Sequence, residues 1–127
     1  MSTTPDEPAP PVVIHRGGVY WVRPAPGVAE YAHPHVVLQD EVFNRSRLDT
    51  VIVCALTTNP HRGREPGNVV LDPGEAGLPQ SSVVVVSQLL TLSKTQLGKY
   101  IGTLSPERVD QILDGLRFQQ QAFFRGR

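Results

Sequence analysis

Residues 51–58 read Val-Ile-Val-Cys-Ala-Leu-Thr-Thr, an almost unbroken apolar run that ends at Asn59-Pro60. A run of this length, rich in β-branched residues and closed by a turn-forming pair, predicts a strand buried on both faces. Cys54 is the only cysteine of the chain and lies inside the run. We therefore expect a buried thiol, and neither a disulfide nor a cysteine-based metal site.

Shorter segments on both sides of this run also have the signature of strands. Each is rich in β-branched or aromatic residues, and most are bounded by turn-forming residues. They span residues 18–23, 35–39, 68–71, 82–87 and 100–104. Residues 93–97 are compatible with one helical turn. With 11 glycines and 12 prolines, this punctuation is typical of short strands joined by turns and not of a helical bundle.

A helix is predicted only at the end of the chain. Ser105-Pro106-Glu107 combines an N-cap residue, a first-turn proline and an early acidic residue, which are three agreeing start signals. Apolar residues then follow at helical spacing, at Val109, Ile112, Leu113, Leu116 and Phe123. Five or six strands followed by one amphipathic helix predict a mainly-β fold, a small barrel with a terminal helix.

Length and charge restrict the class of protein. A chain of 127 residues suits one domain, which we assign to residues 13–127, after a proline-rich arm at 1–12 that we expect to be disordered. Twelve basic residues balance twelve acidic ones, so nucleic acid would have to bind a local patch. No apolar run reaches the ~20 residues that span a bilayer, and no signal peptide is evident. We expect a cytoplasmic protein without membrane contact.

Five blocks resemble, in order and with compatible spacing, the MazF/PemK family of type II toxins. They are residues 16–22 (Arg-Gly-Gly-Val-Tyr-Trp-Val), 33–40 (His-Pro-His-Val-Val-Leu-Gln-Asp), 50–59 (Thr-Val-Ile-Val-Cys-Ala-Leu-Thr-Thr-Asn), 82–89 (Ser-Val-Val-Val-Val-Ser-Gln-Leu) and 97–116. The resemblance implies an SH3-like β-barrel with a C-terminal amphipathic helix, and a homodimer. It also implies cleavage of single-stranded RNA without metal or cofactor, and neutralisation by a cognate antitoxin.

One position departs from the family pattern. The family places a catalytic arginine directly before the proline of the second block, and here that residue is His33. The loop before it is also shortened, to residues 27–33. Thr57 matches the family's catalytic threonine.

The chemistry of RNA cleavage makes histidine a plausible replacement. Without a metal ion, the 2′-hydroxyl attacks the phosphate and needs a base and an acid that work near neutral pH, which suits histidine. Arginine is a poor base but stabilises phosphoryl charge. Pro34 favours extended backbone at His33, so His33 and His35 point to the same side and can serve as base and acid. The Thr57 hydroxyl can hold a phosphate oxygen.

Two structural alternatives remain for the histidine pair. His33 and His35 can form a polar strand edge, with one of them hydrogen-bonded for structural reasons. A metal site would need a third ligand from His15, His61, Glu30 or Asp40, and no strong spacing motif supports one.

The predicted RNA contacts lie mainly in loops, which carry the binding residues of small barrels. Arginine and tyrosine there can grip phosphates or stack on bases, although solvated charge is an equally good explanation. The set consists of Arg16, Glu30, Tyr31, Arg45, Arg47, Thr58, Asn59 and Arg62.

The aromatic residues near the end of the chain suggest a dimer interface, and they also allow an alternative function. Phe118, Phe123 and Phe124 cannot all face one barrel from one helix, so we expect part of this surface to be buried in a homodimer. One alternative function is a gyrase-binding toxin resembling CcdB, which would depend on Phe123, Phe124 and Arg125. Another is an inactive relative that only binds an antitoxin.

Overall fold

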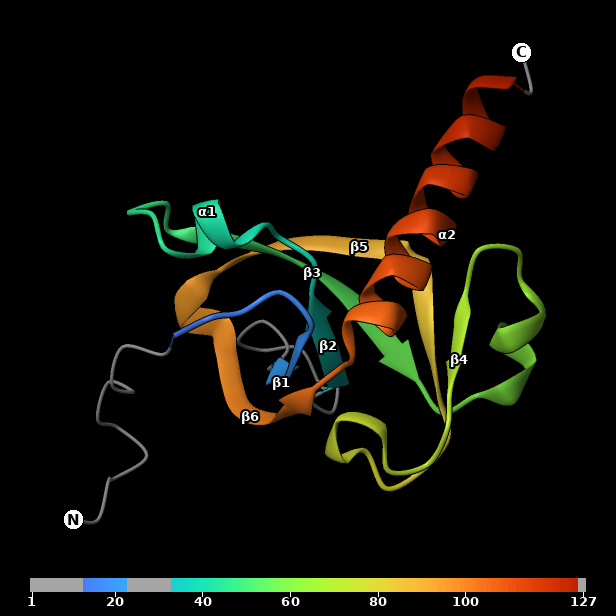
Figure 1. The fold of residues 1–127 in the computed structure, drawn as a ribbon, viewed down its shortest axis with the longest axis horizontal. Coiled ribbons are helices and arrows are strands. Elements are labelled where there is room, and N and C mark those ends of the chain that lie inside the picture. The colour runs from blue at the N-terminus through green and yellow to red at the C-terminus, as the bar shows by residue number, and fades with distance from the viewer. Residues whose placement is uncertain (1–12, 23–32, 126–127) are drawn as a thin grey trace, which may run out of the picture.

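The computed structural model describes residues 13–22 and 33–125 (Figure 1). Its strands form one antiparallel sheet in the order β4-β5-β3-β2-β1-β6. The strands are β1 (Gly18–Val22), β2 (His33–Val37), β3 (Thr50–Thr57), β4 (Val69–Leu71), β5 (Ser82–Ser93) and β6 (Leu97–Thr103); the helices are α1 (Glu41–Asn44) and α2 (Pro106–Arg125), with 3-10 turns η1 (Pro60–Arg64), η2 (Glu75–Gly77) and η3 (Lys94–Gln96). The prediction of a mainly-β fold with a terminal helix is confirmed.

Two apolar clusters lie on opposite faces of the curved sheet. Side chains alternate along β2, so that Val36 joins the cluster under α2 and Val37 joins the second cluster. On β3, Cys54 likewise faces the first cluster and Val53 the second. Because β3 contributes to both clusters, its sequence is apolar almost throughout. The prediction for this strand is confirmed, and burial raises the pKa of the Cys54 thiol to about 12.

The terminal helix begins as predicted. The Ser105 side-chain oxygen accepts a hydrogen bond from the Arg108 N–H at 3.2 Å, and the Ser105 carbonyl accepts one from Val109 at 3.0 Å. Val109 and Ile112 are buried against the sheet. Figure 1 shows that the C-terminal half of α2 continues beyond the sheet, and Phe118 there is 55% exposed. No helix in the described ranges has the length and apolar character to cross a membrane.

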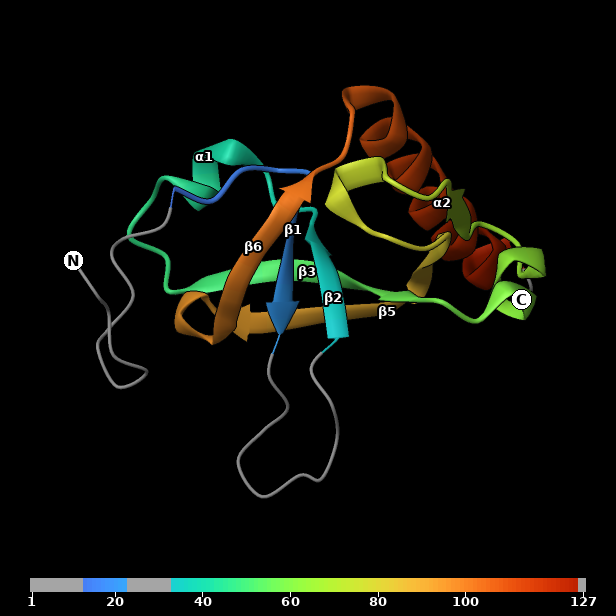
Figure 2. The same ribbon diagram turned by 90° about the horizontal axis from the view of Figure 1, so that it is seen from below.

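Several elements differ from their predicted bounds. β5 continues to Ser93, whereas the prediction ended it at residue 87. The pairing of β5 with β3 shifts here, because residues 85–88 lie opposite Ala55 alone, and β5 bends visibly at this point (Figures 1 and 2). A bulge depends on the partner strand, so periodicity along β5 does not reveal it. β2 starts two residues early, at His33, and α1 was not predicted. Residues 1–12, predicted to be disordered, lie outside the described residues.

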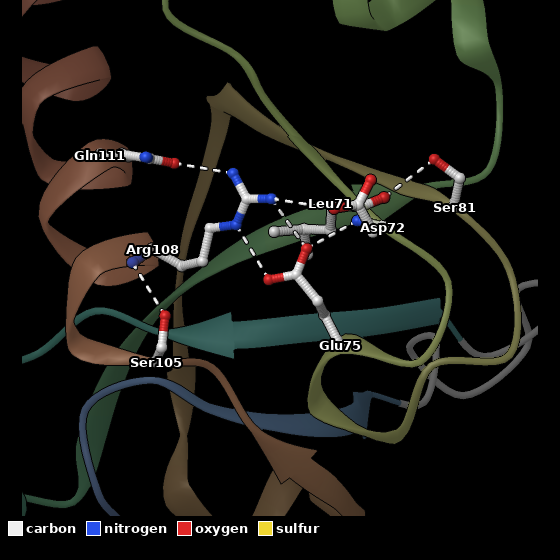
Figure 3. A network of polar contacts seen from close by, with 7 residues as sticks. All are labelled: Leu71, Asp72, Glu75, Ser81, Ser105, Arg108 and Gln111. Atoms are coloured by element: carbon white, nitrogen blue, oxygen red, sulfur yellow. Dashed lines mark hydrogen bonds and ion pairs between the residues drawn. The ribbon is translucent and has the colours of Figure 1, made fainter.

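An ionic network fastens the loop between β4 and β5 to the start of α2 (Figure 3). Arg108 donates two hydrogen bonds of 2.9 Å to the carboxylate of Glu75, and its guanidinium lies 3.7 Å from Asp72. Glu75 also accepts a 2.6 Å hydrogen bond from the Asp72 N–H. The hydrogen bonds from Arg108 lower the pKa of Glu75. The network therefore holds the η2 loop against the helix.

Candidate functional site

The candidate site begins where β1 ends and β2 begins. His33 is the first residue of β2, lies opposite Val22 of β1, and is exposed. His35 follows on the same face and lies between Tyr20 of β1 and Ala55 of β3. In contrast to His33, His35 is only 7% exposed. The two histidines thus share a face of the sheet, but one is open to solvent and the other is part of the interior.

A hydrogen bond defines the state of the buried histidine. The Nδ1 atom of His35 lies 3.0 Å from the backbone carbonyl oxygen of His33. A carbonyl oxygen can only accept, so Nδ1 carries the proton and Nε2 has a lone pair in the neutral ring. Burial lowers the pKa of His35, with a smaller contribution from nearby His33, although the bond to the carbonyl acts in the opposite direction. His35 is therefore a neutral imidazole near pH 7.

Thr57 ends the strand next to the histidines. The last pair of residues between β2 and β3 is His35 and Ala55. If the same register is continued by two residues along each strand, which keeps the same face of the sheet, His33 comes opposite Thr57. The Thr57 hydroxyl oxygen accepts a hydrogen bond from the Asn59 N–H at 3.2 Å. Within the described part of the chain its own proton has no acceptor, so Thr57 can donate a hydrogen bond to an anionic oxygen such as that of a phosphate.

The turn after Thr57 brings positive charge to this end of the sheet. The Asn59 side chain caps η1 by accepting a hydrogen bond from the His61 N–H at 3.1 Å. Asn59 is one of the predicted RNA contacts, and in the structure its side-chain oxygen stabilises this turn. Arg62 lies 2.7 Å from the carboxylate of Glu65, so its charge is largely compensated. His61 and Arg64 are exposed on the same turn.

Arg64 is thus a better candidate for a phosphate contact than Arg62; the sequence indicates the loop of residues 61–64, but the predicted set names Arg62 and not Arg64 from it. The signal that could have indicated it is the spacing of Arg62 and Glu65, three residues apart on a helical turn, which favours an ion pair between them.

Three other arginines that were predicted to contact RNA lie away from His33. Arg16 donates from Nε to the Leu38 carbonyl at 2.9 Å, and its backbone N–H bonds Glu41 at 2.8 Å. Arg45 and Arg47 are exposed in and after the C-cap of α1. Because α1 follows the C-terminal end of β2, all three lie at the other end of this strand from His33. Their binding of RNA stays a prediction. Glu30 and Tyr31 lie outside the described residues.

A metal centre finds no support in the geometry. Across residues 13–22 and 33–125, no three His, Cys, Asp or Glu side chains gather in a way that could hold an ion. Two of the predicted third ligands, His15 and Asp40, lie beside Glu41 and Arg16 at the far end of β2. The arrangement at His33 and Thr57 is instead suited to proton transfer and to hydrogen bonding of an anion.

Comparison with known proteins gives consistent matches. A family model described as a PemK-like, MazF-like toxin of type II toxin–antitoxin systems matches residues 15–119. Endoribonuclease MazF6 of Mycobacterium tuberculosis is 35% identical over 109 residues, which cover 84% of this chain and 96% of that protein. Endoribonuclease EndoA of Bacillus subtilis is 28% identical over 109 residues, 84% of this chain and 93% of its own.

Solved structures show the same fold. The Mycobacterium tuberculosis toxin MazF-mt6 superposes with a TM-score of 0.65 at 25% identity, and the match covers 78% of this chain and 91% of the toxin. MazF from Deinococcus radiodurans superposes with a TM-score of 0.68 at 17% identity, over 87% of this chain and 98% of its own.

Proposed function

Since this chain belongs to the PemK-like, MazF-like family of type II toxins, we propose that it is an endoribonuclease that cuts single-stranded RNA without a metal ion. The observation that supports the proposal is that exposed His33 begins β2 and Thr57 ends the neighbouring strand β3, two residues beyond the last pair of the two strands, His35 and Ala55. The family arginine is absent at position 33, but a proton acceptor and a hydroxyl donor are both present. Because the proposed substrate is cellular RNA and the proposed partner is a protein antitoxin, we propose that the protein acts in the cytoplasm.

The proposed reaction starts with proton transfer to the exposed histidine. His33 accepts the proton of the RNA 2′-hydroxyl while the 2′ oxygen attacks the adjacent phosphorus. Thr57 donates a hydrogen bond to a non-bridging oxygen, where negative charge builds up. The bond from phosphorus to the 5′ oxygen breaks, and this oxygen takes a proton from a water molecule, while the resulting hydroxide takes the proton held by His33 and so restores the neutral base. The products are a 2′,3′-cyclic phosphate and a 5′-hydroxyl end.

Positive charge at the site comes from the turn after Thr57. The family arginine combines position with charge, and histidine in its neutral form supplies no charge. Exposed Arg64 on η1 can compensate the phosphate, because it lies on the turn directly after Thr57, Thr58 and Asn59. Thr58 is exposed at the start of this turn. We assign Arg64 to RNA binding together with Thr58, and Arg62 to the loop structure.

We also propose that the toxin is a homodimer that buries the second half of β5. Residues 82–93 contain no charged residue and no proline, and such strands aggregate if their edge stays open. Within the described residues, β4 pairs only with Ser82–Val84, so the section from Ser87 onward has β3 on one side only. Leu89 and Leu90 are 37% and 45% exposed there. Sedimentation should report a dimer, and Leu89→Lys with Leu90→Lys should shift it to a monomer.

The proposed protein partner is an antitoxin with an acidic, extended segment. Solved relatives include a Mycobacterial endoribonuclease in complex with its cognate antitoxin and MazE-MazF of Deinococcus radiodurans. On this chain, exposed Arg64 and His61 on η1 offer a surface for acidic residues. An antitoxin bound there would exclude RNA.

The test is cleavage of a long, mixed-sequence RNA by purified, antitoxin-free protein in EDTA. We expect discrete fragments with cyclic phosphate ends, and a loss of about 10²-fold or more in His33→Ala. His15→Ala is the matched control, because His15 is an exposed histidine at the far end of β2. Toxicity that survives His33→Ala but not removal of residues 123–127 would favour a CcdB-like gyrase-binding toxin. A folded protein without toxicity or cleavage would be an inactive relative.

A further inference from the structure

We infer that His35 is a positioning residue, which holds the backbone of His33 through its Nδ1–H and exchanges no proton with RNA. The inference rests on the proposed function of His33 and replaces our prediction that the two histidines divide the roles of base and acid. It is carried by the hydrogen bond from His35 Nδ1 to the His33 carbonyl, 3.0 Å long, and by the burial of the ring.

The backbone at the start of β2, at His33 and Pro34, has fewer strand pairings than the rest of β2. β1 pairs with β2 from Val36 back to His33, whereas the pairs between β2 and β3 stop at His35 and Ala55. His33 therefore has a paired strand on one side only. The imidazole of His35 supplies a hydrogen bond to the His33 carbonyl at the position where the β-ladder ends. A side chain two residues away thus takes over part of the role of a missing strand partner.

The surroundings of His35 suit a neutral ring and not a charged one. Its cross-strand neighbours are Ala55, whose small side chain leaves room for the ring, and Tyr20, which is buried. In the described part of β1, β2 and β3, the titratable groups beside His35 are Tyr20 and His33, and neither offers a negative charge near pH 7. Burial raises the pKa of Tyr20 and lowers that of His35. Among the residues that the structure describes, a protonated His35 would thus be buried without a counter-ion.

The proton on Nδ1 of His35 is already engaged in a hydrogen bond. It is donated to the His33 carbonyl, and the opposite nitrogen carries a lone pair in a ring that is 7% exposed. Such a ring has no proton to give to the leaving 5′ oxygen. Its effect on catalysis must pass through the position of His33, where a displacement of about 1 Å can cost about 10²-fold in rate.

Three substitutions separate positioning from proton transfer. Asparagine places an amide N–H where Nδ1 lies and does not titrate, so His35→Asn preserves the bond to the carbonyl. Glutamine reaches the position of Nε2, and leucine fills the space without any donor. We expect His35→Asn to keep kcat within about threefold, and His35→Gln and His35→Leu to lose about 10- to 100-fold in kcat with little change in KM.

Two outcomes would contradict the positioning role of His35. Wild-type kcat in folded His35→Leu would show that the bond has no effect on the site. Equal losses in all three variants, each with a cooperative thermal transition, would indicate that the imidazole itself transfers protons.

NMR of the His33 ring provides a readout that does not need RNA cleavage. The ring resonances of His33 should keep their wild-type positions in His35→Asn and move in His35→Leu. Unchanged resonances in both would overturn the positioning role. If the wild type does not cleave RNA, the proposed function fails, and this spectrum still decides whether His35 positions His33.

Discussion

Gly115 of α2 and Gly67, in the turn between η1 and β4, meet backbone to backbone. A Cβ atom at Gly115 would lie 2.0 Å from the carbonyl oxygen of Gly67, which no ordinary packing permits. Gly67 itself has a φ of +88°, a conformation that side chains disfavour. The terminal helix thus contacts the turn that follows His61 and Arg64. The close contact therefore determines how α2 packs against this turn.

Gly115→Ala is expected to destabilise the protein, although alanine is the better helix former. Alanine stabilises an exposed helix interior by about 1 kcal/mol over glycine, but overpacking costs about 1–3 kcal/mol. With a clash against backbone, we expect a net loss of about 2 kcal/mol in the free energy of unfolding, measured by urea denaturation. Gln120→Ala on an exposed position of the same helix should stay within about 0.5 kcal/mol of wild type. A more stable Gly115→Ala would contradict the contact.

The ion pair of Arg108 and Glu75 should contribute measurably to stability. Both side chains are mostly shielded, with 23% and 26% exposed, and the geometry is bidentate. A double-mutant cycle with Arg108→Ala and Glu75→Gln should give a coupling of about 1 kcal/mol at neutral pH. The exposed pair Arg117 and Asp114 is the control and should show no measurable coupling.

Acid should remove this contribution. The pKa of Glu75 is lowered in the folded protein, so its stabilisation is present above the ordinary glutamate value of about 4.3. It disappears as the pH falls through the lower folded value. The difference in unfolding free energy between wild type and Glu75→Gln should therefore shrink in acid. A constant difference down to the acid transition would argue against the ion pair.

The sequence predicts the sheet and the helix well, because both are encoded locally. The apolar run of β3 and the Ser105 cap need no knowledge of the rest of the chain. The bulge at residues 85–88 and the true end of β5 depend on pairing with β3, and the periodicity of one strand does not contain that information. The candidate site likewise combines features that the local sequence encodes with features that depend on the folded sheet. His33 and Thr57 come from matching blocks, whereas the separate states of His33 and His35 arise from burial that only the folded sheet creates.

His35 should make the protein less stable in weak acid. Its pKa is lowered by burial, so below about pH 6.5 the unfolded chain binds a proton that the folded protein does not. Stability consequently rises with pH in this window and falls as the solution becomes more acidic, by at most about 1.4 kcal/mol per pH unit. Urea denaturation between pH 5 and pH 7.5 should show a steeper decline in wild type than in His35→Asn. Parallel curves would mean that His35 titrates alike in both states.

Thr57 offers the sharpest test of the phosphate contact, because its shape can be kept while its hydroxyl is removed. Thr57→Val is nearly isosteric but loses the acceptor for the Asn59 N–H and the donor for phosphate. Thr57→Ser keeps both. We expect Thr57→Val to lower kcat about 10²-fold, as removal of one donor to a developing oxyanion does, and Thr57→Ser to stay within about fivefold of wild type. The measurement is single-turnover cleavage of a short RNA that contains the mapped site. Asn59→Ala controls for the turn, since it removes the η1 cap without touching the hydroxyl. If Asn59→Ala is as slow as Thr57→Val, the threonine acts by shaping the turn and not by binding phosphate.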